Sequence, residues 1–115
     1  MNECIFCKII NKEIPADIVY ENESIIAFKD INPAAPIHVL VIPKKHICKI
    51  TDLKPEDGII IQKIYEGINE VATLQGIKEK GFRVITNCGE NGGQEVNHLH
   101  FHVLGGKSLG PKIVR

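Results

Sequence analysis

The sequence predicts a single α+β domain built on an antiparallel sheet of about five strands, and three observations lead to this fold class. Five short apolar segments have the length of strands, whereas only one long segment repeats its apolar residues at helical spacing. Most of the strands follow one another without an intervening helix, which favours hairpin pairing over a parallel sheet. The length of 115 residues suits one domain over 1–115 and leaves no room for a second.

The first half of the chain is expected to hold a short helix and three strands. Residues 4–14 are predicted to be helical up to Pro15, since proline disfavours helix at and before its own position. The apolar residues of this helix share one side: Ile5, Phe6, Ile9 and Ile10. Two strands are expected over 18–20 and 25–28, joined by a hairpin turn, and a third over 38–42.

The second half is expected to hold the long helix and two more strands. The helix is predicted over 55–74, with Gly76 as its stop. Its apolar stripe consists of Ile60, Ile61, Ile64, Ile68, Val71 and Ala72. A fourth strand is expected over 82–86 and a fifth over 98–104, with a glycine-bearing loop at 88–94 between them.

Composition excludes several classes of protein. Fourteen basic residues balance fourteen acidic ones, so the chain has no basic field for nucleic acid or for an anionic membrane surface. No apolar run approaches the ~18–20 residues of a membrane span. The two ends carry no recognisable targeting signal, so a cytoplasmic location is expected. The four cysteines are therefore expected to be thiols or metal ligands rather than disulfides.

The segment His98-Leu99-His100-Phe101-His102 carries the strongest chemical signal. Side chains alternate on a strand, so the three histidines should share one face, with neighbouring rings ~7 Å apart. An ordinary polar strand face would favour Thr, Lys, Glu or Ser instead. Histidine transfers protons, ligates metals and accepts phosphoryl groups near neutral pH. His38 and His46 bracket the third strand and are expected to lie near the other three.

Two further features accompany the histidines. The glycines of the 87–94 loop allow backbone N–H groups to converge on an anion, which suits a phosphate directly upstream of the histidine strand. The Cys4-x-x-Cys7 pair has metal-ligand spacing. A thiol-redox motif is disfavoured because no strand precedes the pair.

These residues resemble the histidine triad superfamily. His98-Leu99-His100-Phe101-His102-Val103-Leu104 matches the signature His-φ-His-φ-His-φ-φ, where φ is apolar. Other blocks are similar to the histidine triad nucleotide-binding branch: Ile5 to Ile10, Glu13 to Ala16, Phe28 to Ile31, Pro36 to His38, Val41 to His46, and Gly92 to Gln94. The resemblance implies a homodimer paired through the long helix and a strand edge. It also implies binding of purine nucleotides such as AMP and hydrolysis of nucleoside phosphoramidates.

The resemblance also implies roles for individual residues. His100 would be the nucleophile on the α-phosphorus, flanked by His98 and His102. Phosphate oxygens would be held by Asn87, Gln94 and the backbone around Gly93, and ribose hydroxyls by Asp30. The base pocket would be lined by Ile5, Phe6, Ile9, Phe28, Ile31 and His38. Animal members carry serine where Glu95 stands here, so Glu95 is expected to face outward, and the leaving-group preference stays open.

A structural zinc ion is a further expectation. Two thiolates from Cys4 and Cys7 and two imidazoles from His46 and His98 would make a closed tetrahedral set. The related galactose-1-phosphate uridylyltransferases bind zinc through a similar arrangement. Two buried thiols without a metal are the alternative. The reaction itself would need no cofactor.

Two other functions share much of this pattern. Dinucleoside polyphosphate hydrolases of the same superfamily carry the same triad, and turnover of phosphoramidates against dinucleotides would discriminate the two. A nucleotide-binding adaptor with little turnover is the second alternative, which a retained His100 disfavours because binding alone needs no nucleophile.

Overall fold

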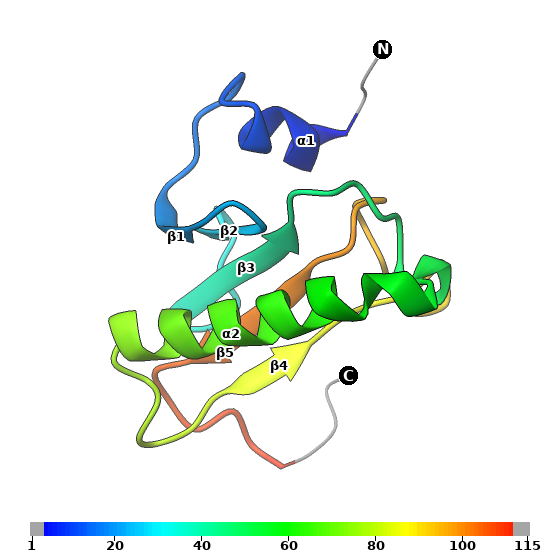
Figure 1. Ribbon diagram of the computed structural model, residues 1–115. Helices are drawn as coiled ribbons and strands as arrows, with labels where there is room; N and C mark the ends of the chain where they lie inside the picture. The colour runs from blue at the N-terminus through cyan, green and yellow to red at the C-terminus, as the bar shows by residue number, and fades with distance from the viewer. Residues whose placement is uncertain (1–3, 112–115) are drawn as a thin grey trace.

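The computed structural model describes residues 4–111. The expectation that the two ends carry no targeting signal concerns residues that lie partly outside this range. The elements are α1 (Ile5–Ile10), β1 (Ile18–Glu21), β2 (Ile25–Lys29), β3 (Ile37–Pro43), α2 (Gly58–Leu74), β4 (Arg83–Ile85) and β5 (Phe101–Gly105) (Figure 1). The strands form one sheet in the order β1-β2-β3-β5-β4, and every neighbouring pair is antiparallel. This architecture confirms the predicted α+β class and its five strands.

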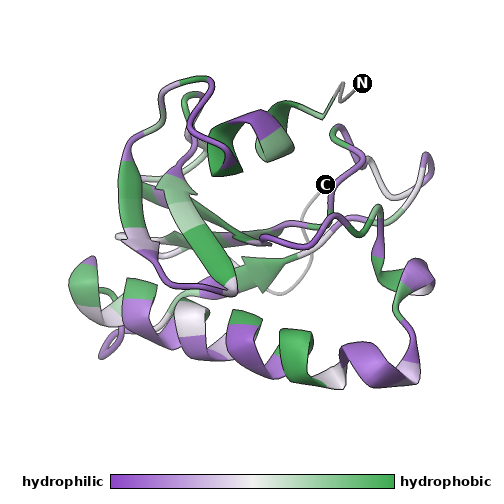
Figure 2. Ribbon diagram, turned by 45° about the horizontal axis from the view of Figure 1, so that its top comes forward, coloured by the Kyte–Doolittle hydropathy of each residue, from purple (hydrophilic) through white to green (hydrophobic). Residues whose placement is uncertain are grey.

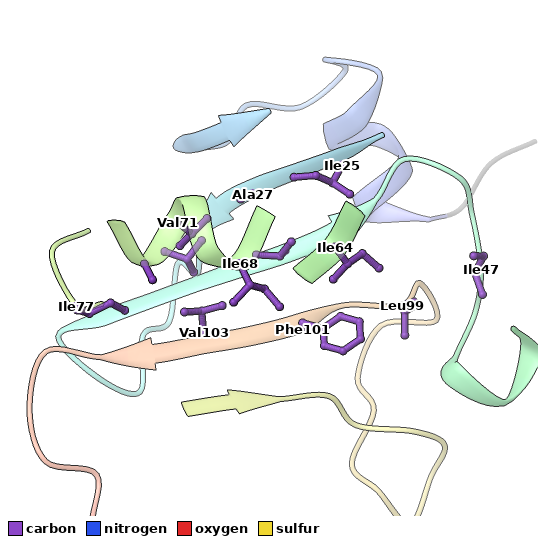
Figure 3. Close-up of a cluster of buried hydrophobic side chains, with 13 residues drawn as sticks. Ile25, Ala27, Ile47, Ile64, Ile68, Val71, Ile77, Leu99, Phe101 and Val103 are labelled. Carbon is purple, nitrogen blue, oxygen red and sulfur yellow. The ribbon is translucent and has the colours of Figure 1, made fainter. Parts of the chain in front are cut away.

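The two helices lie on opposite faces of the sheet (Figure 2). Alternate residues of β2 point to opposite sides. Ile25 and Ala27 join the cluster packed under α2, whereas Ile26 and Phe28 join a second cluster under α1. The α2 cluster also takes in Leu99, which with Phe101 and Val103 of the histidine segment faces the core, as predicted (Figure 3). The face under α1 is therefore the one left for the histidines.

The long helix differs only slightly from its prediction. A 3₁₀ turn over Pro55–Asp57 precedes it, and the buried Asp57 carboxylate accepts from the Lys54 N–H (3.0 Å) and pairs with Lys45 (2.9 Å). Both contacts lower the pKa of Asp57. The chain leaves the helix through Gly76, whose φ of 71° favours glycine. Among residues 4–111, none of the helices has the length and apolar character needed to span a membrane.

Two predicted boundaries were wrong. The first helix ends at Ile10 rather than at residue 14, because Lys12 takes a left-handed φ of 63° and the Glu13 N–H turns back to the Lys8 carbonyl (2.8 Å). The fifth strand begins at Phe101 rather than at residue 98. If its register with β3 continued, residue 100 would lie opposite Ile42 and residue 99 opposite Pro43, which has no N–H to donate; the Leu99 N–H bonds to the Ile47 carbonyl instead (2.6 Å).

Candidate functional site

A cavity of about 450 Å³ opens on the α1 face of the sheet. Its apolar wall comes largely from α1 and β2, and its polar end comes from β5 and the loop before it. Among its lining residues are ten of the predicted site residues: Ile5, Phe6, Ile9, Phe28, Asp30, Ile31, Asn87, Gly93, His100 and His102. An enclosed apolar pocket with a few convergent polar groups is the usual form of a small-molecule site.

His100 is held in one orientation at the polar end of this cavity. It is 5% exposed, and its Nδ1–H donates to the His98 carbonyl at 2.7 Å. A carbonyl can only accept, so this partner assigns the proton to Nδ1 and leaves a lone pair on Nε2. The Thr86 hydroxyl fixes the backbone by donating to the His100 carbonyl (2.8 Å). The result is a buried imidazole with a nucleophilic nitrogen available.

His102 has the opposite tautomer, and a chain of hydrogen bonds assigns it. The Ala34 N–H donates to His38 Nδ1 (3.0 Å), so His38 carries its proton on Nε2. His38 Nε2–H in turn donates to His102 Nδ1 (2.9 Å), which leaves His102 with its proton on Nε2. Burial, and then the neighbouring His100 and His38, lower the pKa of His102 to about 4. His102 is therefore neutral near pH 7 and can donate from Nε2.

Asp30 lies beside this pair. Its Oδ2 is 3.4 Å from His38 Nε2, while its Oδ1 accepts from the Asn32 N–H (2.8 Å). Burial lowers the pKa of His38, and the Asp30 charge opposes that shift. His38 does not line the cavity, although it was expected in the base pocket; it lies behind the wall and supports His102.

Hydrogen bonds within residues 87–94 hold the glycine loop in its conformation. Asn87 Nδ2 donates to the Gly92 carbonyl (2.7 Å), and a Cβ on Gly92 would come within 2.4 Å of the Cys88 carbonyl oxygen. Gly93 has a φ of 77°, and its N–H closes on the Glu90 carbonyl (3.0 Å). The loop is thus closed by its own hydrogen bonds; glycine is required at position 92 for space, and the positive φ favours glycine at position 93.

Gln94 was expected to hold phosphate oxygens, but its side-chain amide makes hydrogen bonds to backbone groups of the protein. Its side-chain oxygen accepts from the Gly89 N–H (2.9 Å), and its Nε2 donates to the carbonyls of Cys48 (2.6 Å) and Val96 (2.9 Å). The amide is thus engaged in holding the loop against the segment after β3. A direct phosphate contact from this side chain stays a prediction.

Glu95 is exposed to solvent, as expected of an outward-facing residue, and it also contributes to the lining of the cavity.

The four predicted metal ligands converge at the start of α1. Cys4 Sγ lies 3.3 Å from His98 Nδ1, and Cys7 Sγ lies 3.6 Å from the same nitrogen. Cys7 Sγ is also 3.2 Å from His46 Nδ1, and the two imidazole nitrogens are 3.1 Å apart. All four donor atoms lie within 4.8 Å of one another.

This donor set fits a tetrahedral ion. Zn–N bonds of about 2.05 Å and Zn–S bonds of about 2.3 Å at tetrahedral angles give edges of about 3.3 Å for N···N and about 3.6 Å for N···S, close to the distances found. The outward nitrogens are also engaged. His98 Nε2–H donates to the Pro43 carbonyl (2.8 Å), and His46 Nε2 is 3.5 Å from Cys48 Sγ. Such partners fix the tautomer in which Nδ1 is a ligand. The cluster could hold a metal ion.

Comparison with known proteins identifies the family to which the chain belongs. A family model described as "Scavenger mRNA decapping enzyme C-term binding" matches residues 3–113. The purine nucleoside phosphoramidase of Escherichia coli (strain K12) is 44% identical over 111 residues, which cover 96% of this chain and 93% of that protein. The chain belongs to the histidine triad (HIT) family.

Other HIT proteins are at least as similar. HitA of Neisseria gonorrhoeae is 48% identical over 105 residues, covering 91% of this chain and 97% of that protein. Among solved structures, a HIT family hydrolase from Clostridium thermocellum has a TM-score of 0.96 at 53% identity, covering 99% of both chains. A histidine triad protein from Clostridium difficile has a TM-score of 0.94 at 49% identity, covering 98% of both.

The spacing of the HIT signature predicted that the histidines lie together, but the distance between their rings differs from that on a regular strand. The rings of His100 and His102 have centroids 5.1 Å apart, closer than the ~7 Å of a flat strand. Sequence reasoning missed Ala34, Thr86 and Cys48 as supporting residues. The first two act through a backbone N–H and a hydroxyl, and no residue pattern in the sequence indicates such contacts.

Proposed function

We propose that this HIT protein binds purine nucleotides and hydrolyses nucleoside phosphoramidates at the P–N bond, through a covalent nucleotidyl intermediate on His100. The observation that carries the proposal is the tautomer of His100: its Nδ1–H is committed to a carbonyl, its Nε2 keeps a lone pair, and the residue lines the cavity. The relative from E. coli named purine nucleoside phosphoramidase supports the substrate class.

The proposed reaction uses the two histidines of the cavity. His100 Nε2 attacks the α-phosphorus, the P–N bond breaks, and the amine leaves with a proton. His102 lines the same cavity and would donate a hydrogen bond from Nε2–H to a phosphate oxygen, while the leaving nitrogen would take its proton from solvent. Water then attacks the phosphorus, the bond from phosphorus to His100 Nε2 breaks, and the proton lost by the water passes to solvent, which releases AMP and restores the neutral His100 imidazole.

Binding of the nucleotide would divide between the two ends of the cavity. The purine would lie against Phe6, Phe28 and the other apolar residues of the wall, and Asp30 would accept from the ribose hydroxyls. Asn87 and the loop backbone near Gly93 would face the phosphate. These assignments place most of the binding contacts away from His100.

Steady-state hydrolysis of adenosine phosphoramidate tests this function, with diadenosine polyphosphates as competing substrates. The wild type should turn over the phosphoramidate faster, and mass spectrometry should locate the transient adduct on His100. His100→Ala should lose hydrolysis by at least about 10³-fold and still bind AMP. Near wild-type turnover of His100→Ala, or an adduct on another histidine, would contradict the mechanism.

The Cys4, Cys7, His46 and His98 cluster would hold a structural zinc ion, because two thiolates and two imidazoles suit zinc and leave no open position. The ion would supply cross-linking of the fold rather than chemistry on the substrate. Elemental analysis of protein purified without chelator should find about one zinc per chain, and far less than that would count against the site.

The protein would also act as a homodimer. Ile59, Tyr65 and Leu74 on α2 are each more than half exposed, and Val84 lies on β4, an edge strand. A second copy would cover this apolar surface and the unpaired edge. Sedimentation should give twice the 12.8 kDa of one chain. A monomer at micromolar concentration would contradict this assembly.

A further inference from the structure

One wall of the cavity and one side of the metal cluster belong to the same short helix. Ile5, Phe6 and Ile9 of α1 line the cavity, while Cys7 of α1 and Cys4 at its N-cap are cluster members. The other two members, His46 and His98, come from the segment after β3 and the segment before β5. The cluster therefore joins the cavity wall to the triad.

The polypeptide alone provides little to hold α1 in place. The helix has six residues, fewer than an isolated helix needs to be stable in water. Its packing on the sheet depends mainly on Phe6 and Ile9, which are 6% and 7% exposed. The Phe6 ring lies 5.2 Å from the ring of His100, so any movement of α1 displaces a side chain in contact with the nucleophile.

His98 fixes one side of the metal cluster to the sheet. His98 is 0% exposed, and its Nε2–H donates to the Pro43 carbonyl at the end of β3. A ligand bond from Cys4 or Cys7 to an ion held by His98 would tie α1 to the centre of the sheet. Without that bond, α1 keeps the apolar contacts of about a turn and a half and the thiol–imidazole contacts of Cys4 and Cys7, which are weaker than bonds to a metal ion.

We propose that Cys4 and Cys7 are positioning residues for the nucleotide cavity: through a bound metal ion they hold α1 against the triad, so that nucleotide affinity depends on metal loading. This inference rests on the proposed nucleotide-binding function. The apparent dissociation constant rises by the inverse of the fraction of molecules with α1 in place. If the wall is formed about one-tenth of the time without metal, AMP binds about tenfold more weakly.

Titration calorimetry with AMP tests the proposal on four samples: zinc-loaded wild type, chelator-treated wild type, Cys4→Ser and Lys8→Ser. Cys4 Sγ accepts from the Cys7 N–H (3.3 Å), so it caps the helix as well as facing the cluster. Serine is a good N-cap residue and a poor zinc ligand, so Cys4→Ser separates the two roles. Lys8 is also in α1, is not a donor and does not line the cavity.

Zinc-loaded wild type and Lys8→Ser should bind AMP with dissociation constants within about twofold of each other. Chelated wild type and Cys4→Ser should bind at least about tenfold more weakly. Hydrogen exchange should show that chelation removes protection over residues 5–10 and leaves it intact in α2. Equal AMP affinity with and without zinc, or an equal loss of protection in α2, would overturn the inference. No AMP binding by the zinc-loaded wild type would overturn the proposed function itself, and this inference with it.

Discussion

Replacement of His38 tests whether this residue supports His102 or contacts the bound base. In the structure it does not touch the cavity, but it accepts from the Ala34 N–H and donates to His102 Nδ1. His38→Ala should therefore lower kcat far more than it weakens AMP binding. A role in the base pocket, expected from the family resemblance, would instead raise the dissociation constant and leave kcat nearly unchanged.

The size of the effect follows from what the variant removes. Without His38, His102 is free to move its proton to Nδ1, and loss of a positioned hydrogen-bond donor to the phosphate costs about 10²–10³ in rate, or roughly 3–4 kcal/mol of barrier. The Ala34 N–H and His102 Nδ1 also lose their partners, which should lower the free energy of unfolding by roughly 2–4 kcal/mol. Pre-steady-state turnover, AMP titration and urea unfolding measure the three quantities. A His38→Ala protein with unchanged kcat and weakened AMP binding would refute the reasoning.

Three further predictions concern the supports of the site. Cys48→Ala removes the sulfur next to the exposed imidazole of the cluster and should weaken zinc binding by about 10–100-fold in a chelator competition; unchanged affinity would contradict that role. Gly92→Ala puts a Cβ 2.4 Å from the Cys88 carbonyl and should lower both stability and turnover, whereas Gly58→Ala has open space around it and should lower neither. The lowered pKa of His102, about 4, makes it bind fewer protons folded than unfolded, so its contribution of roughly 3 kcal/mol is present above pH ~6.5 and lost as the pH falls toward 4. Urea unfolding from pH 7 to pH 4 should show this loss, and His102→Gln should reduce it.

Much of the fold could be predicted because the pattern is local. The short apolar runs of β2 and β3 predicted strands, and the stripe of α2 indicates its buried side. The start of β5 could not be predicted from its own residues. It depends on Pro43, which lies opposite the strand in the sheet and far away in the sequence.

The residues of the candidate site could likewise be predicted only where they form a local pattern in the sequence. The histidine spacing and the Cys4-x-x-Cys7 pair are local patterns, and both led to residues that do lie together. The engagement of Gln94 could not be foreseen, because its partners are backbone groups, one of them the Cys48 carbonyl, 46 residues away. The same holds for Ala34, whose side chain plays no part in its contact with His38.

The two cavity histidines differ because each is oriented by a backbone group that cannot titrate. A carbonyl, that of His98, takes the Nδ1 proton of His100, whereas an amide, that of Ala34, acts through His38 to place a proton on Nε2 of His102. Identical side chains thus present a lone pair and a donor to the same cavity. Since peptide groups keep their polarity at every pH, the fold sets which nitrogen of each neutral ring carries the proton.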